Sequence, residues 1–292
     1  MTLGIGFKTS PQDVGWATLD ETWALAGELD VFDTGWMNDH LVDPVTDRGA
    51  SSFEALTLVA ALAHHVPGKR IGHGVLSNTF RHPVVLAKAA TVLDHVTGGR
   101  FILGLGAGWL ESEHEPYGIP LPPIRERIDR LESAVGVLEA LFSAEATRPE
   151  GVTRPDAFYP LAGATNVPPP VTPGGPPIYL GGQKRRGIAL AARSGRGWIM
   201  PGDRAGDAAY LADRRGALLR AMEEIDRDPT GFAFVGQVAV GPEATDRRRA
   251  LEEARAFLGA GATDVIVGIS PSAGPEALRL AARDVAEPLA GA

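Results

Sequence analysis

The chain has 292 residues, a formal net charge of −8 and no cysteine. The lack of cysteine excludes disulfides, thiolate nucleophiles and zinc sites with cysteine ligands. The negative charge argues against a nucleic-acid partner, because sequence-independent binding to nucleic acid depends on clustered Lys and Arg. The N-terminal residues do not resemble a signal peptide, and no apolar run is long enough to span a bilayer. We therefore expect no membrane partner and a cytoplasmic location.

Short apolar runs alternate along the chain with longer segments of helical periodicity. The runs predicted as strands are 3–7, 31–37, 70–77, 101–105, 177–181, 197–200, 232–240 and 263–268. The segments predicted as helices are 13–29, 53–65, 83–96, 124–142, 184–194, 204–225, 245–258 and 275–290. A succession of eight β-α units is typical of the closed TIM barrel, which needs about 250 residues. An open dinucleotide-binding sheet is disfavoured because no G-x-G-x-x-G motif follows the first strand. The sequence thus predicts an α/β fold, a (β/α)8 TIM barrel forming a single domain over residues 1–292.

Two long connections, 107–123 and 145–176, are predicted as insertions at the C-terminal face of the barrel strands. The second one is rich in proline, which excludes a regular helix over its length. Long connections in compact domains are usually functional covers or flexible segments. We expect the segment 145–176 to form a lid over the substrate side, with a flexible surface loop as the alternative.

The active site of a TIM barrel lies at the C-terminal ends of its strands. Asp39 and His40 follow the second predicted strand. A histidine beside a carboxylate can relay protons or hold a polar ring edge. The alternative is that Asp39 only caps a turn and that His40 packs beside it. Their place at a strand end favours a catalytic role for both.

Glycine is frequent at two of the predicted strand ends. Gly104, Gly106 and Gly108 alternate through the fourth strand end, and the pair Gly181-Gly182 follows the fifth. Without side chains, backbone amides can approach a flat ring or a phosphate closely, although a tight barrel turn gives the same pattern. The basic residues 184–186 come directly after the second glycine group, before a predicted helix whose N-terminal amides could hold an anion. Together these features favour a phosphorylated cofactor.

Acidic residues and a histidine cluster after the fourth strand, at Glu111, Glu113, His114 and Glu115. Such a run is most often the solvated start of a helix or loop. We therefore predict no metal site there, and none elsewhere in the chain.

Three motifs carry a resemblance that runs almost end to end. They are GWMNDH (35–40), RHPVVLAKAATVLDHVTGGRFILGLGAGW (81–109) followed by Glu113 and Tyr117-Gly118, and PPIYLGGQ (176–183) followed by GWIM (197–200). The chain resembles the bacterial luciferase-like superfamily, in its branch of coenzyme F420-dependent oxidoreductases. The resemblance implies a TIM barrel, a deazaflavin or flavin ring at the strand ends, and a homodimer.

The resemblance also implies roles for individual residues. The ring would lie against a bulge in the third strand that contains a cis peptide bond, by position Gly74–Val75. Asp39 and His40 would lie beside the reactive ring, and Ser77 would contact its edge. The residues expected to contact the ring or a phosphate tail are Gly106, Ala107, Gly108, Gly181 and Gly182. In this light the glycines would leave room for the cofactor.

One position departs from the family pattern. In the sugar-phosphate dehydrogenase of this family a catalytic glutamate follows the glycine-rich strand end, where this sequence has Trp109. A sugar-phosphate substrate is therefore doubtful, and the tryptophan favours an apolar or aromatic substrate. The leading hypothesis is hydride transfer between F420 and a small organic molecule. The alternatives are an FMN-dependent monooxygenase and a non-catalytic flavin-binding barrel.

Overall fold

The computed structural model describes residues 3–43, 51–270 and 273–291, so the termini of the predicted domain lie outside the described residues. One parallel sheet organises the chain. Its strands are β1 (Gly4–Thr9), β2 (Thr34–Met37), β3 (Arg70–His73), β4 (Leu76–Ser77), β5 (Phe101–Gly106), β8 (Ile178–Leu180), β9 (Gly197–Ile199), β10 (Ala233–Val240) and β11 (Asp264–Ile269). Each of the eight predicted strand segments overlaps at least one of these strands.

The sheet closes on itself. Its strands are hydrogen-bonded in the order β3-β2-β1-β11-β10-β9-β8-β5-β4, and β3 also pairs with β5. All of these pairings are parallel. The third predicted strand is broken into β3 and β4, so nine strands fill eight positions around the barrel. The predicted TIM barrel is confirmed.

The break in the third strand holds the cis peptide bond that the resemblance implies. This bond joins Gly74 and Val75, and both residues are half-buried. Before the break β3 pairs with β2 and β5, and after it β4 pairs with β5. Val75 therefore lies at the mouth of the barrel, where it packs on the core that fills the barrel interior.

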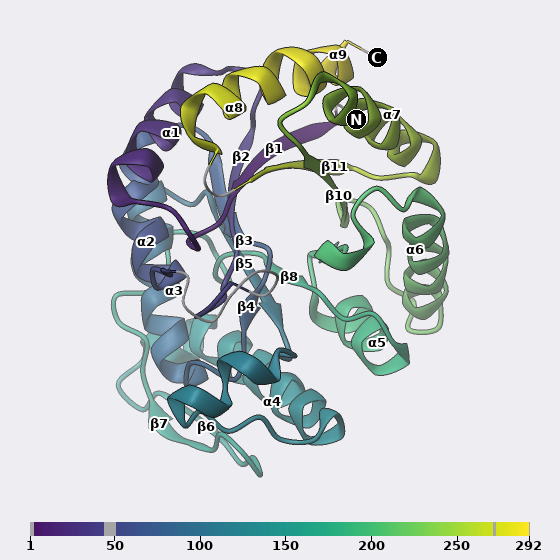
Figure 1. Ribbon diagram of the computed structural model, residues 1–292. Helices are drawn as coiled ribbons and strands as arrows, with labels where there is room; N and C mark the ends of the chain where they lie inside the picture. Colours follow the sequence, from purple (N-terminus) through teal and green to yellow (C-terminus); the bar gives the residue numbers. More distant parts are fainter. Residues whose placement is uncertain (1–2, 44–50, 271–272, 292) are drawn as a thin grey trace.

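Helices surround the strands (Figure 1). They are α1 (Trp16–Glu28), α2 (Ala55–Leu62), α3 (Pro83–Thr97), α4 (Ile124–Phe142), α5 (Arg185–Ser194), α6 (Ala208–Glu223), α7 (Ala244–Ala260), α8 (Gly274–Ala281) and α9 (Glu287–Ala290). The ends of α3 follow from its sequence. Pro83 occupies the first turn after the capping residue His82, and Gly98 ends the helix with a φ of 62°. No helix within the described residues is long and apolar enough to cross a membrane.

The protein has two apolar cores, one inside the barrel and one between strands and helices. The inner core consists of Trp36, Ile102, Tyr179, Ile199, Ala233, Val235 and Ile266. Alternate residues of the same strands, such as Phe101 and Phe234, face outward and join the larger outer core. This alternation follows from the two-residue period of a strand. The packed interior supports the residues at the barrel mouth from below.

The proline-rich segment 145–176 contains no α-helix, as its composition predicts. It forms a hairpin of β6 (Val152–Arg154) and β7 (Leu161–Ala164) on the outside of α3 and α4. Asp156 accepts a hydrogen bond from Ser133 of α4, and the Thr172 hydroxyl donates to Asp94 of α3 at 2.9 Å. Figure 1 shows the hairpin beyond the ring of strands.

The predicted lid is therefore wrong. The segment connects the end of α4 to the start of β8, and both lie at the end of the barrel opposite the strand C-termini. The other insert, 107–123, does follow the C-terminal end of β5 and lies at the mouth.

Candidate active site

The residues predicted for the site gather along one half of the barrel mouth. Asp39 and His40 follow β2, Ser77 ends β4, and the two glycine groups end β5 and follow β8. These strands are neighbours around the barrel. We call this half the glycine side. The structure thus brings the predicted residues onto one arc, although the chain separates the first from the last by more than a hundred residues.

His40 is held by a buried carboxylate from the first insert. Its Nδ1 lies 3.0 Å from Oε2 of Glu113, which also accepts a hydrogen bond from the Leu41 amide at 3.1 Å. Glu113 is 1% exposed. A carboxylate can only accept here, so Nδ1 carries the proton and Nε2 is the nitrogen free to exchange one. Among the described residues, none forms a hydrogen bond with Nε2.

Trp109 stands beside this pair. Its ring meets the His40 ring edge to face, with centroids 5.9 Å apart and planes at 88°. The indole is 64% exposed, which is unusual for so large an apolar side chain. It gives the mouth an apolar wall next to the histidine.

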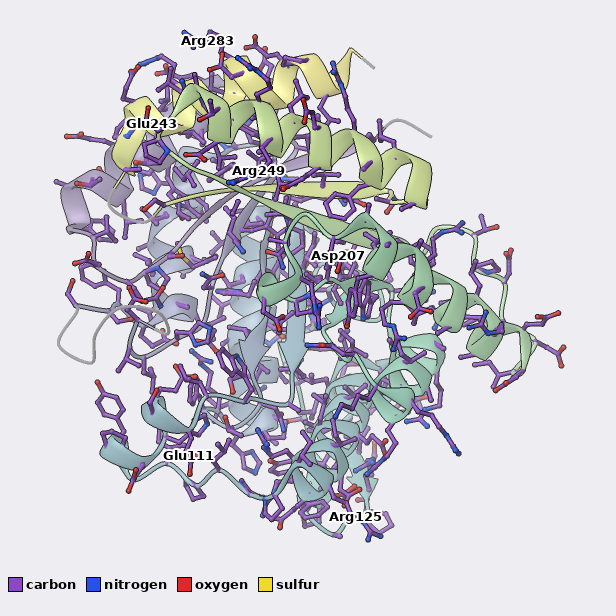
Figure 2. The ribbon with its side chains drawn as sticks, turned by 45° about the vertical axis from the view of Figure 1, so that its right-hand side comes forward. Glu111, Arg125, Asp207, Glu243, Arg249 and Arg283 are labelled. Atoms are coloured by element: carbon purple, nitrogen blue, oxygen red, sulfur yellow. The ribbon has the colours of Figure 1, made fainter. Side chains whose placement is uncertain are left out.

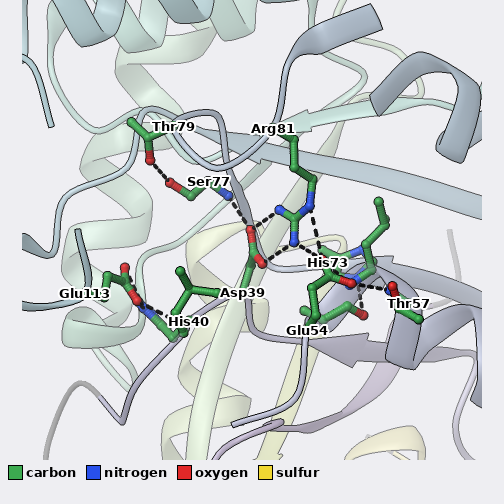
Figure 3. A network of polar contacts seen from close by, with 12 residues as sticks. Asp39, His40, Glu54, Thr57, His73, Ser77, Thr79, Arg81 and Glu113 are labelled. Atoms are coloured by element: carbon green, nitrogen blue, oxygen red, sulfur yellow. Dashed lines mark hydrogen bonds and ion pairs between the residues drawn. The ribbon is translucent and has the colours of Figure 1, made fainter. Parts of the chain in front are cut away.

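Asp39 has a different set of contacts (Figure 3). It is 4% exposed, and its two oxygens accept hydrogen bonds from Arg81 at 2.7 and 2.8 Å. The Ser77 amide donates to the same carboxylate at 2.8 Å. Arg81 also contacts Glu54, the capping residue of α2. Asp39 therefore ties the end of β2 to β4 and to α2, and its carboxylate does not bind the His40 ring.

Two pKa values show how strongly this network is buried and paired. Burial raises the pKa of Glu54, but hydrogen bonds from Thr57 and Arg81 outweigh it and lower the value to about 2. Burial lowers the pKa of His73, next to the network, to about 4. His73 is fully buried, with Nε2 3.2 Å from the Ala55 carbonyl oxygen. The glycine side therefore carries a fixed Arg–carboxylate cluster beside a neutral histidine at physiological pH.

A second chain of hydrogen bonds starts at Ser77. Its hydroxyl lies 2.6 Å from that of Thr79, which lies 2.7 Å from Nε2 of His114. Nδ1 of His114 lies 2.6 Å from the Leu110 carbonyl oxygen, which can only accept. In the neutral ring Nε2 then accepts from Thr79, and Thr79 accepts from Ser77. The first insert is thereby fixed to β4, and the lone pairs of Ser77 remain able to accept a hydrogen bond.

The glycines of this side are required by the protein itself. A Cβ at Gly104 would lie 1.7 Å from the His73 carbonyl oxygen, and one at Gly106 would lie 2.8 Å from Val75. A Cβ at Gly181 would lie 3.3 Å from Val75, and one at Gly182 would lie 2.5 Å from the backbone of α5. The space without side chains is therefore filled by the strand break and by α5. That these glycines also leave room for a cofactor, and that their backbone contacts it, stays a prediction.

Gly108 is constrained in another way. Its φ of 77° is a conformation that other residues rarely adopt, and a Cβ would lie 2.7 Å from the Ser77 hydroxyl. Ala107, between the two glycines, is half-buried and packs on the outer core. The turn after β5 is thus shaped to pass close over β4.

The opposite half of the mouth is a cavity of about 370 Å³ at the ends of β1, β10 and β11. We call it the lysine side, because Lys8 reaches into it from β1. Lys8 donates a hydrogen bond to Oε1 of Gln237 at 2.6 Å. Burial lowers the pKa of Lys8 to about 8. The sequence places Lys8 at a strand end but gives no further signal that it lies in a cavity.

The glycine side has features that suit a ring cofactor with an anionic tail. The oxygen of the Asn78 side chain, next to Ser77, is buried and has no hydrogen-bond partner among the described residues. At the other end of the arc, Lys184 and Arg185 are exposed at the first turn of α5, whose amide groups are free to hold an anion. Arg186 is not available for an anion, because it forms ion pairs with Asp129 and Glu132 of α4. The residues present therefore fit such a cofactor.

Sequence reasoning missed two residues of this site. Glu113 was expected to be solvated, but it is buried against His40; its place in the long motif was the signal that could have identified it. Arg81 opens the same motif, yet only the folded chain shows that it meets Asp39. Although Glu113 and His114 are adjacent in the chain, their side chains contact different residues: Glu113 contacts His40, and His114 contacts Thr79.

The fold and this arc of residues define a barrel enzyme with a carboxylate-held histidine. The model of the luciferase-like monooxygenase family matches residues 9–289. An F420-dependent glucose-6-phosphate dehydrogenase of Kribbella flavida is 31% identical over 250 residues, which make up 78% of this chain and 71% of that protein. The chain therefore belongs to the luciferase-like family, in its branch of F420-dependent oxidoreductases.

Solved structures agree on the fold. An F420-dependent secondary alcohol dehydrogenase, in complex with an F420-acetone adduct, has a TM-score of 0.81 at 18% identity, with 99% of both chains covered. An F420-dependent tetrahydromethanopterin reductase of Methanopyrus kandleri has a TM-score of 0.79 at 15% identity, covering 99% of this chain and 100% of that one.

Proposed function

We propose that this protein is an F420-dependent oxidoreductase that moves a hydride between the deazaflavin and an organic substrate, with His40 as the proton donor or acceptor. The observation that carries the role of His40 is its contact with the buried carboxylate of Glu113. The cofactor is supported by the F420-dependent relatives and by the fit of the glycine side.

When bound, F420 supplies the hydride chemistry, and the protein supplies position and electrostatics. Gly74 and Val75 would support the ring from the strand break, and Ser77 and Asn78 would meet its polar edge. The turn 106–108 would border the ring, and Gly181-Gly182 with the first turn of α5 would hold a phosphate of the tail. Asp39 is a positioning residue: it holds the backbone of β4 at Ser77, and β4 in turn would support the cofactor ring.

Oxidation of an alcohol requires loss of a hydride from carbon and of a proton from oxygen. Nε2 of His40 is free to take that proton, and in the reverse direction it would return the proton to a carbonyl oxygen. Glu113 holds the orientation of the His40 ring and the tautomer that leaves Nε2 free. Trp109 excludes water from one side of the reacting atoms.

The substrate differs from that in the name of the Kribbella flavida relative. The wall formed by Trp109 favours an apolar or aromatic group beside His40, and the glutamate expected at this position for a sugar-phosphate dehydrogenase is missing. We therefore propose a small apolar or aromatic alcohol or ketone as the substrate class.

Titration of the protein with F420 and with FMN, followed by fluorescence, tests the cofactor. We expect F420 to bind more tightly. A tenfold preference for FMN, or about 1.4 kcal/mol, would favour the alternative of an FMN-dependent monooxygenase. Binding of F420 without turnover of a panel of alcohols and ketones would favour the non-catalytic flavin-binding barrel.

We further propose a cytoplasmic homodimer of one luciferase-like domain, residues 1–292. Val85, Val92 and Val96 are each more than half exposed along one face of α3, and such a row of apolar side chains is suited to a second copy. Sedimentation of the purified protein tests this assembly. A monomer at micromolar concentration would contradict it.

A further inference from the structure

The cavity on the lysine side is a feature of the barrel mouth that the proposed chemistry leaves without a role. Its volume of about 370 Å³ lies within the range of small-molecule sites. It opens beside Arg249 of α7, which Figure 2 shows next to strands β10 and β11. The cavity therefore has room for part of a substrate.

Lys8 is the one positive charge of this cavity that lacks a carboxylate partner within the described part of the chain. Its ammonium group has three donors, and the contact with Gln237 uses one of them. The Gln237 amide group is itself fixed, because its nitrogen donates to the Met200 carbonyl oxygen. Two donors of Lys8 are thus available in a fixed position.

The other charges of the cavity compensate each other. Arg249 lies 3.4 Å from Asp246 and 3.6 Å from Glu253, and its side chain is 59% exposed. Asn38, on the β2 side of the cavity, donates a hydrogen bond to the Ser10 hydroxyl at 2.7 Å. Among the three charged residues that line the cavity, Asp246 and Arg249 pair with each other, and Lys8 is left with the one positive charge that faces neutral polar groups.

An unpaired buried charge has no structural benefit of its own. Burial disfavours the charged form, as the lowered pKa of about 8 shows, yet Lys8 remains mostly protonated at neutral pH. Apart from Lys8, the ionisable residues that line the cavity are Asp246 and Arg249. A group that costs stability and faces a cavity is typical of a binding residue.

We propose that Lys8 binds the carboxylate of a singly charged organic acid, and that such an acid is the substrate of this enzyme. The apolar residues Val240 and Ile269 would border its hydrocarbon part. A phosphate dianion is disfavoured, since it calls for a second free cation or a bidentate arginine. This proposal rests on the proposed oxidoreductase function and makes its substrate class more specific.

Three matched probes test the carboxylate site: benzoate, its neutral amide benzamide, and phenyl phosphate. Calorimetry measures their affinities for the wild-type protein, with and without saturating F420. We expect benzoate to bind at least tenfold more tightly than benzamide, which cannot form a charged hydrogen bond, and than phenyl phosphate, whose second negative charge has no free cation to pair with. Equal binding of benzoate and benzamide, tighter binding of phenyl phosphate, or no binding of benzoate at millimolar concentration would overturn the proposal.

Variants then locate the site. Lys8→Met should weaken benzoate at least tenfold and leave benzamide and F420 affinity unchanged, and Lys8→Arg should restore part of the benzoate affinity. Lys88→Met removes an exposed lysine of α3 and serves as the control with wild-type binding. Unchanged benzoate affinity in Lys8→Met would contradict the assignment.

Thermal unfolding separates a binding role from a structural one. Lys8→Met should unfold at the wild-type temperature or higher, because it removes a buried unpaired charge. A large drop would mean that Lys8 supports the fold, and would count against the proposal. The F420 titration is independent of these results. If F420 does not bind but benzoate binding depends on Lys8, only the proposed cofactor is wrong. If F420 binds but benzoate is not preferred, only the proposed acid substrate is wrong.

Discussion

The two halves of the barrel mouth are built in opposite ways. On the glycine side, carboxylates, Arg81 and hydroxyl groups bind one another, and the glycines allow neighbouring strands to pack closely. On the lysine side, a single ammonium group faces a cavity with most of its donors unused. The comparison teaches that a saturated network suits a group held in one position, while an unsaturated charge suits a ligand that must arrive and leave.

The largest expected effect comes from His40 on the glycine side. His40→Ala should lower turnover by about 10²–10⁴-fold, the usual contribution of a general acid or base. F420 affinity should stay near the wild-type value, because the ring is held by other residues. Steady-state kinetics and the F420 titration measure both quantities. Turnover within threefold of wild type would remove His40 from the mechanism.

Glu113→Gln sharpens the same point, since it keeps the contact with His40 but not the charge. We expect a smaller loss of turnover than in His40→Ala, measured by the same steady-state kinetics.

The close packing of the glycine side can be broken at Gly104. Gly104→Ala places a Cβ against the His73 carbonyl oxygen, so the strands must move apart, at a cost of about 1–3 kcal/mol or more. Urea unfolding measures the loss. Gly259→Ala is the matched control, because that glycine is exposed in α7 with open space around it, and alanine favours the helix by about 1 kcal/mol. Equal stability of the two variants would contradict the packing argument.

The most gradual expected effect is the pH dependence that buried His73 gives to stability, because it is spread over more than two pH units. Its pKa is about 4 in the folded protein and 6.5 ordinarily, so between these values the unfolded chain binds more protons. Stability therefore falls as the pH is lowered from 6.5 to 4, by roughly 3 kcal/mol at most. Unfolding at several pH values should show a shallower slope for His73→Phe. His95→Gln, which changes an exposed histidine, should keep the wild-type slope.

Strand and helix positions could be predicted because local periodicity determines them: α4 spans the predicted residues 124–142, and Pro83 begins α3. The strand ends of a barrel then place Asp39 and His40 at the mouth. Contacts between side chains that are far apart in the sequence could not be predicted. Glu113 looks like part of a solvated acidic run until β2 brings His40 to it. The glycine pattern does not show that Gly104 and Gly106 pack against the break between β3 and β4, which only the folded chain reveals.

The position of the hairpin β6–β7 on the outer wall of α3 and α4 has a practical consequence. Its strand residues Ala162 and Gly163 are exposed, and the hairpin takes no part in either half of the mouth. A fluorescent dye or an immobilisation tag attached there should report on the folding of the outer wall while leaving catalysis intact.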